Sequence, residues 1–368
     1  MTPIPLVDLG AQHRQVADEV AEGLGRVIGD TAFILGEEVR AFEREYGDFL
    51  GAPYCVGVAS GTDALELAVR ALDIGPGDEV ILPANTFIAT ALAVARAGAT
   101  PVLVDCDPDR HLIDPEGVAD RLGPRTRAVM AVHLFGQIAP MEALAEIVAD
   151  TNVRLLEDAA QAQGARRHGQ SAGTIGVAAG TSFYPGKNLG AYGDAGAVTT
   201  TVEAVARRVA ALRNYGSEVK YHHPEMGFNS RLDSLQAVVL RAKLRLLPRW
   251  NEARRKAAAR YARLLAEFEG VTLPETLPGN EHVFHLYVVR VPERDEVLRR
   301  LNAAGVGAGI HYPVPVHLQG AFSQLGHERG DFPITEAAAD EILSLPLFPE
   351  ITFEQQAQVA DELRRALA

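Results

Sequence analysis

The chain has 368 residues, of which 47% are hydrophobic and 23% are charged, and its formal net charge is −13. A chain of this length suits two domains with a large buried core. The acidic balance argues against a general nucleic-acid binder, because such proteins neutralise phosphates with a basic face. The two cysteines, Cys55 and Cys106, lack the spacing of a metal site or a disulfide framework, which predicts free, buried thiols.

The start of the chain carries no visible targeting signal. Residues 1–8 lack the basic start and apolar core of a secretory signal. No apolar run in the sequence is long enough to cross a bilayer. We therefore expect a cytoplasmic protein.

Short β-rich apolar runs alternate with helical stretches between residues 54 and 201. The strand-like runs are 55–59, 79–83, 101–105, 128–133, 154–158, 180–183 and 197–200. Several of them are continuous runs of Val, Leu and Ile, which indicates burial on both faces of a sheet. The segments 62–72, 88–97 and 141–149 between them have helical patterns. This alternation predicts an α/β domain with a mostly parallel, seven-stranded sheet.

The pattern changes after residue 201. A predicted helix at 202–214 is followed by a polar stretch rich in Gly, His and Tyr. The amphipathic stretch 231–247 precedes Pro248, which we expect to stop or bend the helix, and a second helix is predicted at 251–269. The alternating run 285–291 and a helical tail then predict a smaller α+β domain. We expect the division into domains to fall at 1–247 and 248–368.

Lys187 stands in a turn rich in Gly and Pro, within Ser182-Phe-Tyr-Pro-Gly-Lys-Asn-Leu-Gly190. The turn follows a predicted strand, and ligands of α/β folds bind at the carboxyl ends of strands. A deprotonated lysine held in such a place forms a Schiff base with an aldehyde cofactor. An isolated lysine would be better explained as a surface-loop residue, and only the other motifs favour the catalytic interpretation.

Asp158 ends a predicted buried strand in the stretch Glu157-Asp-Ala-Ala-Gln161. A carboxylate there is costly unless it meets a cation. Pyridoxal 5′-phosphate (PLP) offers a pyridinium nitrogen, and an acidic partner keeps that nitrogen protonated and the ring a strong electron acceptor. Gln161, one helical turn further on, is suitably spaced to bond the ring hydroxyl. Asp158 is equally suited to cap a following helix, and the two roles are compatible.

Three weaker motifs have polar or aromatic residues at the ends of predicted strands or helices. Ser60-Gly-Thr-Asp follows a strand and opens a helix, so it is either a phosphate seat or an ordinary N-cap. Phe87 follows another strand and is either a stacking residue for a flat ring or part of the core. Asn229 and Arg231 stand where the long amphipathic helix opens and could reach an anion there, and Asn229 is equally a candidate helix cap.

Together these motifs resemble the DegT family of PLP-dependent sugar aminotransferases, which have the aspartate aminotransferase-like (fold type I) architecture. The resemblance extends from Pro5-Leu-Val-Asp-Leu to the tail. It also includes Gly75-Pro-Gly-Asp-Glu-Val and His133-Leu-Phe-Gly. Several motifs in a fixed order make this a specific match, although each alone is weak.

The resemblance implies a role for each residue of these motifs. Lys187 is the implied Schiff-base lysine, and Asp158 is the implied partner of the pyridine nitrogen. The implied contacts of the ring oxygen, the ring face and the phosphate are Gln161, Phe87, Gly61, Thr62, Ser182 and the partner subunit's Asn229. The last contact implies a homodimer with shared active sites. Related dehydratases carry His where aminotransferases carry Lys, so Lys187 favours transamination.

Two further stretches are similar to members that act on thymidine-diphosphate 3-keto-6-deoxy sugars, with glutamate as the implied amino donor. They are Arg213-Asn-Tyr-Gly-Ser217 with Lys220-Tyr221, and His311-Tyr-Pro-Val-Pro-Val-His317. The resemblance then implies a sugar pocket lined by Tyr184, Tyr221, His311 and His317, and a structural loop role is the alternative for each histidine. Other members aminate a 4-keto sugar or a keto-inositol. Lys220 and the basic stretch 254–256 are candidate cations for the nucleotide, and a solvated charged face is the alternative for that stretch.

Two other classes of protein compete with this interpretation. A nicotinamide dehydrogenase should show Gly-x-Gly-x-x-Gly after its first strand, where this chain has Ser60-Gly-Thr-Asp. A non-catalytic regulator that binds PLP or a sugar nucleotide is disfavoured because the two predicted domains fill the chain without an appended DNA-binding segment.

Overall fold

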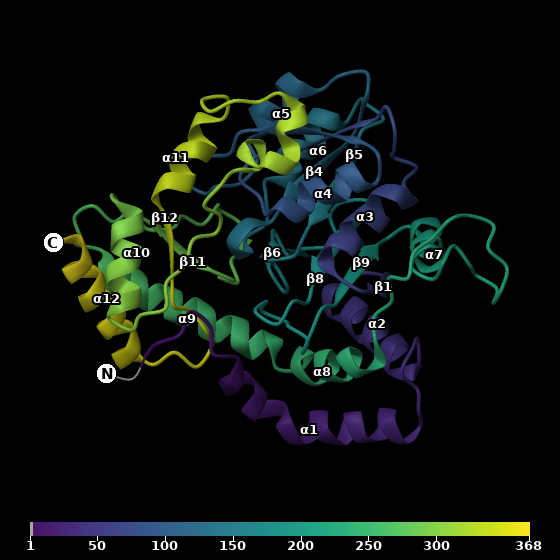
Figure 1. Ribbon diagram of the computed structural model, residues 1–368, viewed down its shortest axis with the longest axis horizontal. Helices are drawn as coiled ribbons and strands as arrows, with labels where there is room; N and C mark the ends of the chain where they lie inside the picture. Colours follow the sequence, from purple (N-terminus) through teal and green to yellow (C-terminus); the bar gives the residue numbers. More distant parts are fainter. Residues whose placement is uncertain (1–2) are drawn as a thin grey trace.

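The computed structural model describes residues 3–368, and its larger part is built on a seven-stranded sheet (Figure 1). The strand order is β1-β9-β8-β5-β4-β2-β3. The strands are β1 (Tyr54–Val58), β2 (Glu79–Pro83), β3 (Thr100–Val104), β4 (Thr126–Val132), β5 (Arg154–Asp158), β8 (Ala178–Ser182) and β9 (Gly196–Thr200). Only β9 runs antiparallel to its neighbours, β1 and β8. The prediction of a mostly parallel sheet of seven strands is confirmed.

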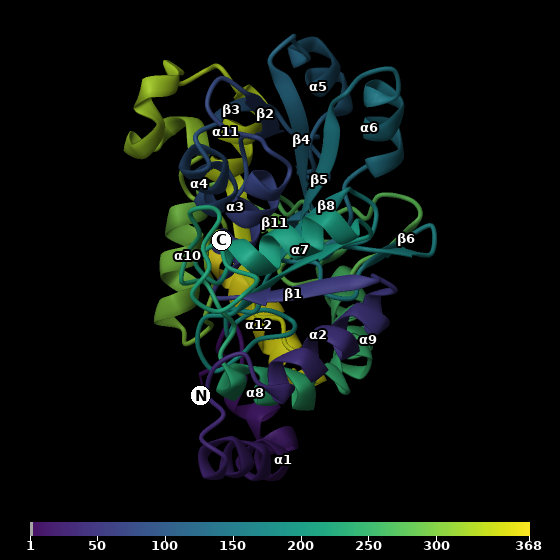
Figure 2. The same cartoon turned by 90° about the vertical axis from the view of Figure 1, so that its right-hand side faces the viewer.

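Helices cover both faces of this sheet, because alternate side chains of each strand point to opposite sides. Val80 and Leu82 of β2 lie in one core with α3 (Gly61–Ala71), α4 (Ile88–Arg96) and α7 (Glu203–Leu212). Ile81, between them, lies in a second core with α5 (Pro115–Arg121) and α6 (Met141–Val148). Figure 2 shows β4 and β5 between α3 and α4 on one side and α6 on the other. The continuous apolar strands of the sequence are therefore buried on both faces.

Long helices lie beyond the sheet edge that carries β1. They are α1 (Leu9–Gly29), α2 (Glu37–Leu50), α8 (Ser234–Leu244) and α9 (Leu247–Leu265). The expectation that Pro248 stops or bends a helix that reaches residue 247 is wrong. The helix α8 already ends at Leu244, and Pro248 stands in the first turn of α9. Proline suits that position because the first N–H groups of a helix have no intrahelical partner.

The smaller part combines the antiparallel strands β11 (Tyr287–Arg290) and β12 (Ile342–Leu345) with helices α9, α10 (Arg294–Ala303) and α12 (Phe353–Leu367). Its core also takes in Ile4, which bridges to Val306. A third, short sheet is formed by β10 (Asn280–Glu281), β6 (Arg166–Arg167) and β7 (Gln170–Ser171). No helix within residues 3–368 is long and apolar enough to span a membrane.

The two parts exchange segments across the proposed boundary at residues 247 and 248. Val316 of η2 (Val316–Leu318), Phe322 of η3 (Gly320–Leu325) and Phe332 all lie in the core of the large sheet. Phe332 immediately precedes α11 (Pro333–Glu341). The division into 1–247 and 248–368 remains a proposal, and its residues 1–2 lie outside the described chain.

The N-terminus of α11 is capped from the large sheet. Asp105, directly after β3, accepts hydrogen bonds from the backbone N–H groups of Ile334 (2.9 Å) and Thr335 (2.8 Å) and from the Thr335 hydroxyl (2.6 Å). These N–H groups are among the donors that a helix leaves without an internal partner. One carboxylate therefore joins the segment after η3 to the end of β3, an edge strand of the sheet.

We expect Asp105→Ala to lower the free energy of unfolding by about 2 kcal/mol, because it leaves several donors of one helix end without their partner. The matched control is Asp114→Ala. Asp114 caps its own helix, α5, through the N–H groups of Glu116 and Gly117, and its removal should cost about 1 kcal/mol. Urea unfolding followed by circular dichroism measures both. An Asp105→Ala protein no less stable than Asp114→Ala would contradict the role of Asp105 as a cap between segments.

Candidate active site

A cavity of about 440 Å³ opens where the carboxyl ends of β5 and β8 meet the start of α3. Its lining contains most of the site residues expected from the sequence: Gly61, Thr62, Phe87, Asp158, Gln161, Ser182, Tyr184, Lys187 and His311. Parallel strands bring their carboxyl ends to one edge of a sheet, which explains how residues far apart in the sequence meet here.

Lys187 reaches this cavity from the turn that follows β8. Its backbone N–H donates to the carbonyl of Tyr184 (2.8 Å), which closes the turn. Burial lowers the pKa of the Lys187 amine to about 8, and the negative charge of Asp158 opposes that shift. An amine with this pKa is partly neutral near pH 8 and is then a nucleophile and a base. The structure therefore places Lys187 in a cavity wall and not in a solvated surface loop.

Asp158 lies at the end of β5 and is 5% exposed. Its Oδ1 accepts from the Ala160 N–H (3.1 Å), and its Oδ2 accepts from the Thr90 hydroxyl (2.7 Å). Burial raises the pKa of Asp158, and the hydrogen bond from Thr90 is the largest effect that opposes this. Asp158 has no ion-pair partner within the described chain. The residues after it form turns, so the alternative that it caps a following α-helix is wrong.

Gln161 is held in a fixed orientation at the cavity wall. Its Oε1 accepts from the Phe135 N–H (2.6 Å), which fixes the orientation of the amide. Its Nε2 donates to the hydroxyl of Tyr312 (3.0 Å). Tyr312 also lines the cavity, with its ring centroid 5.1 Å from that of Phe87. Tyr312 was not among the site residues expected from the sequence. A hydroxyl-bearing aromatic beside His311 was the signal available in the sequence.

The first turn of α3 forms a cradle with backbone donors. Ser60 caps this helix by accepting from the Asp63 N–H (3.1 Å), and Gly61 and Thr62 follow at the cavity. A Cβ on Gly61 would lie 2.5 Å from the Cβ of Ser182, so only glycine lets the helix start approach the end of β8 this closely. Helix N-termini of this kind bind phosphate through their free N–H groups and the helix dipole.

The other expected site residues lie outside the cavity of this chain. Asn229 is exposed and bridges to Asn214, and the N-cap of α8 is Asp233, so Asn229 is not the cap of that helix. Tyr221 is 81% exposed in the segment between α7 and α8. His317 is buried, and its Nε2 is 2.9 Å from Oε1 of Glu336. The structure thus gives His317 a structural role in place of the implied position in a sugar pocket.

The basic stretch 254–256 does not face the cavity as a cationic surface. Arg254 is buried, and its Nη1 donates to the carbonyls of Phe284, His285 and Leu347. Neither alternative given for this stretch, a nucleotide contact or a solvated face, describes Arg254. Both Arg255 and Lys256 form ion pairs with Glu252.

The three parts of the site match three groups of PLP. An amine of lowered pKa suits the aldehyde, a buried carboxylate without a cation suits the pyridine nitrogen, and the start of α3 suits the phosphate. This set of side chains, on a mostly parallel seven-stranded sheet, defines a PLP-dependent transferase of fold type I.

Comparison with known proteins gives the family. The model of the DegT/DnrJ/EryC1/StrS aminotransferase family matches residues 15–364. This chain therefore belongs to the DegT/DnrJ/EryC1/StrS aminotransferase family, and it is an aminotransferase whose cofactor is PLP.

Similar proteins include aminotransferases of nucleotide-linked sugars. The chain is 45% identical over 366 residues to the UDP-N-acetyl-3-dehydro-alpha-D-glucosamine 3-aminotransferase of Acidithiobacillus ferrooxidans, with 100% of this chain and 98% of the relative covered. It is 45% identical over 361 residues to the dTDP-3-amino-3,4,6-trideoxy-alpha-D-glucose transaminase of Streptomyces venezuelae, with 98% and 95% covered. The crystal structure of S. venezuelae DesV in complex with a ketimine intermediate matches with a TM-score of 0.97 at 44% identity, covering 99% of this chain and 98% of DesV.

We expect the amine of Lys187 to titrate near pH 8, because burial disfavours its charged form. Below that pH the ammonium does not attack an aldehyde, and above it the neutral amine does. The rate at which cofactor-free protein takes up PLP covalently should therefore rise with pH and level off above about pH 8. Stopped-flow absorbance measures this rate. A rate that keeps rising up to about pH 10, the value of an ordinary lysine, would contradict the lowered pKa.

Proposed function

We propose that this enzyme transfers an amino group from glutamate to a nucleotide-linked keto-sugar, and that the substrate is a 3-keto-6-deoxy sugar carried by thymidine diphosphate. The observation that carries the proposal is the meeting of Lys187, Asp158 and the start of α3 in one cavity. The two relatives described above support the 3-keto position, because both names place the amino group at C-3 of a nucleotide sugar. The stretches around Lys220 and His311 support a deoxysugar carried by thymidine diphosphate, because they are similar to family members that act on such substrates.

Each cavity residue has a proposed task. The bound cofactor supplies an aldehyde and a ring that accepts electrons from the carbon undergoing proton exchange. Lys187 would hold that aldehyde, and its Nζ would move a proton to and from the carbon that bears the transferred nitrogen. Asp158 holds the proton on the ring nitrogen, and Gln161 donates to the ring oxygen. Phe87 covers one face of the ring.

The remaining residues of the cavity hold the cofactor phosphate and the sugar. Gly61, Thr62 and Ser182 bind the cofactor phosphate from this chain. Tyr184, which is 59% exposed, and His311 contact the sugar at the mouth of the cavity. Burial lowers the pKa of His311 to about 4, so it is neutral at pH 7 and bonds the sugar without carrying a charge. His311 is oriented by a hydrogen bond between its Nδ1 and the Ser344 hydroxyl (2.8 Å).

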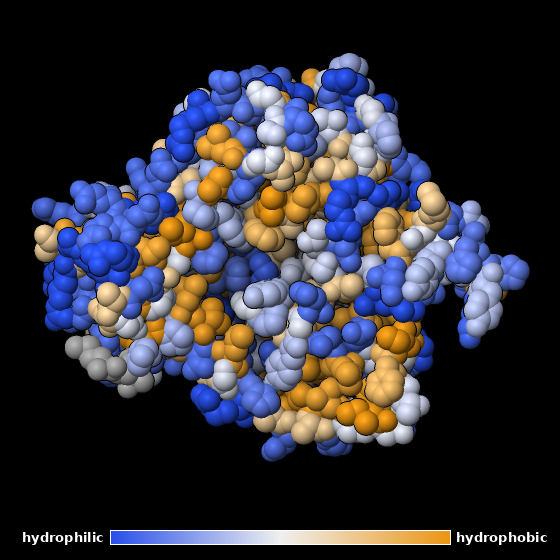
Figure 3. All heavy atoms as spheres, in the orientation of Figure 1, coloured by the Kyte–Doolittle hydropathy of each residue, from blue (hydrophilic) through white to orange (hydrophobic). Residues whose placement is uncertain are grey.

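A second copy of this chain completes the site in our proposal. The segment between α7 and α8 projects from the body of the molecule (Figure 1), and its Val219, Tyr221 and Met226 are 63%, 81% and 94% exposed. Asn229 lies at the base of this segment, outside the cavity of its own chain. Apolar surface also gathers over the end of α1 and the start of α2 (Figure 3), where Phe33 and Ile34 are exposed. An exposed apolar patch of this kind is typical of a subunit interface.

The substrate proposal is tested with the purified holoenzyme, glutamate and a panel of 3-keto and 4-keto sugar nucleotides and a keto-inositol. We expect an amino-sugar nucleotide from the 3-keto substrates, detected by mass spectrometry. Lys187→Ala and Lys187→Arg should each lower turnover by about a thousandfold or more, because neither side chain anchors the aldehyde or moves the proton. Amination of only a 4-keto sugar or the inositol would replace the proposed substrate. Turnover by Lys187→Ala at the normal rate would overturn the role of the lysine.

The dimer is tested by sedimentation at several protein concentrations. We expect a species of twice 39.5 kDa. Ile34→Asp should weaken dimerisation at least about tenfold, because a carboxylate in an apolar interface must lose its water, and it should also weaken PLP binding. Phe353→Asp is the matched control, since Phe353 is an exposed apolar residue of α12, far from this patch. A wild-type monomer that binds PLP with full affinity would contradict the shared site.

A further inference from the structure

Two threonine hydroxyls connect the start of α4 to Asp158. Thr86 precedes this helix and Thr90 lies in its first turn, with their Oγ1 atoms 2.7 Å apart. The Thr90 Oγ1 is in turn 2.7 Å from Oδ2 of Asp158. Thr90 is completely buried and Thr86 is 3% exposed. Neither threonine was among the site residues expected from the sequence.

The direction of these hydrogen bonds follows from the number of protons. An ionised carboxylate only accepts, and each threonine hydroxyl has one proton to donate. Thr90 therefore donates to Asp158 whenever Asp158 is ionised. Thr86 must then be the donor to Thr90, whose own proton is already committed. The carbonyl of Phe87, 3.2 Å from Thr90 Oγ1, is a longer and weaker alternative acceptor. Both protons of this chain of hydroxyls point toward the carboxylate.

No other side chain within the described residues donates to Asp158. Its second oxygen accepts from a backbone group, the Ala160 N–H. The charged or titratable groups that face it are Lys187, Tyr312 and His133. His133 accepts from the Ala139 N–H through Nδ1 (3.2 Å), and its Nε2 is 2.8 Å from Oε2 of Glu157, so its hydrogen bonds go to groups other than Asp158. Thr90 is therefore the side chain that fixes the carboxylate.

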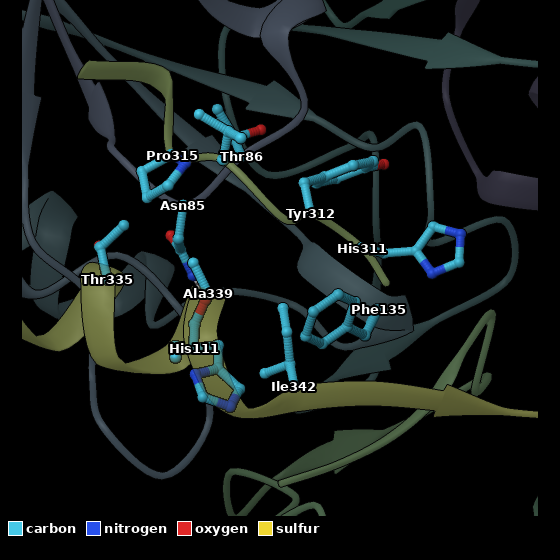
Figure 4. Close-up of a pocket in the computed structure, with 12 residues that line it drawn as sticks. Asn85, Thr86, His111, Phe135, His311, Tyr312, Pro315, Thr335, Ala339 and Ile342 are labelled. Carbon is cyan, nitrogen blue, oxygen red and sulfur yellow. Dashed lines mark hydrogen bonds between the residues drawn. The ribbon is translucent and has the colours of Figure 1, made fainter. Parts of the chain in front are cut away.

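The outer end of the chain of hydroxyls is shielded from solvent. Thr86 lies in the wall between the large cavity and a second hollow (Figure 4), which Tyr312 also borders. The remaining border of the hollow includes Pro315 and Thr335. Its volume of about 10 Å³ is that of a single water molecule. Thr86 itself is only 3% exposed, so little bulk water competes with its hydroxyl for Thr90.

We propose that Thr90, oriented by Thr86, is a positioning residue that holds the Asp158 carboxylate ionised and aimed at the ring nitrogen of PLP. This inference rests on the proposed role of Asp158. A hydrogen bond to a charged group is worth more than one between neutral groups, and its loss leaves the charge less well solvated. Without the Thr90 hydroxyl the Asp158 carboxylate is a stronger base, so the proton that it shares with the ring nitrogen moves toward Asp158 and the ring becomes a weaker electron acceptor.

The test compares Thr90→Val, which removes the hydroxyl and keeps the shape, with Thr90→Ser, which keeps the hydroxyl. Each protein is loaded with PLP labelled with ¹⁵N in the ring, and the nitrogen shift is followed by NMR as the pH is raised. We expect the nitrogen shift of the Thr90→Val protein to lie closer to that of a neutral pyridine than the wild-type shift does, because the shared proton moves toward the more basic carboxylate. Thr90→Val should also weaken PLP binding and lower kcat about tenfold, with little change in the KM for the sugar. Thr90→Ser should restore both values to within about threefold of the wild type.

Three further variants separate the possible failures. Thr199→Val is the matched control, because the buried Thr199 hydroxyl bonds the Gly173 carbonyl (2.7 Å) and has no contact with Asp158. It should leave the nitrogen shift unchanged. Thr86→Val should move the nitrogen shift in the same direction as Thr90→Val but less. If Asp158→Asn does not change the nitrogen shift, the proposed role of Asp158 fails. If Asp158→Asn changes it and Thr90→Val does not, or Thr90→Ser fails to restore it, only the positioning role of Thr90 is overturned.

Discussion

A buried carboxylate is stable only when hydrogen bonds or a cation replace the water it has lost. Asp158 meets this constraint in part, through Thr90 and Ala160, and has no ion-pair partner in residues 3–368. The same burial that penalises the charge of Asp158 also penalises the charge of Lys187, whose pKa falls to about 8. In our proposal, a cationic ring between them would satisfy the carboxylate and leave the amine reactive. The chemistry of the site thus depends on the buried negative charge of Asp158.

The fold supplies the geometry for this arrangement. Asp158 ends β5 and Ser182 ends β8, the neighbouring strand, while the start of α3 approaches the same edge because Gly61 has no side chain. His311 and Tyr312, which come from the C-terminal part of the chain, line another side of the cavity. The sheet thus fixes the positions of Asp158 and of the strand end that precedes Lys187, and Asp105 holds the start of α11 at the sheet edge.

Sequence patterns were informative where burial on both faces left a continuous apolar signal, so the strands and their order of appearance were predicted well. Pro248 was misread because proline ends one helix and begins another with the same local signal. Thr90 was missed for a physical reason. Within a helical stretch of small apolar residues a threonine carries no functional signal, and only the approach of α4 to β5 gives its hydroxyl a partner. The buried positions of Arg254 and His317 likewise depend on tertiary packing. The roles of the cavity residues toward PLP and sugar remain proposals.

The most direct measurement is a crystal structure of the enzyme grown with excess PLP. The account predicts continuous density from the Lys187 side chain to the cofactor, with the ring nitrogen within hydrogen-bond distance of an Asp158 oxygen and the phosphate at the start of α3. A cofactor bound elsewhere, or one whose ring nitrogen faces away from Asp158 toward solvent, would contradict it.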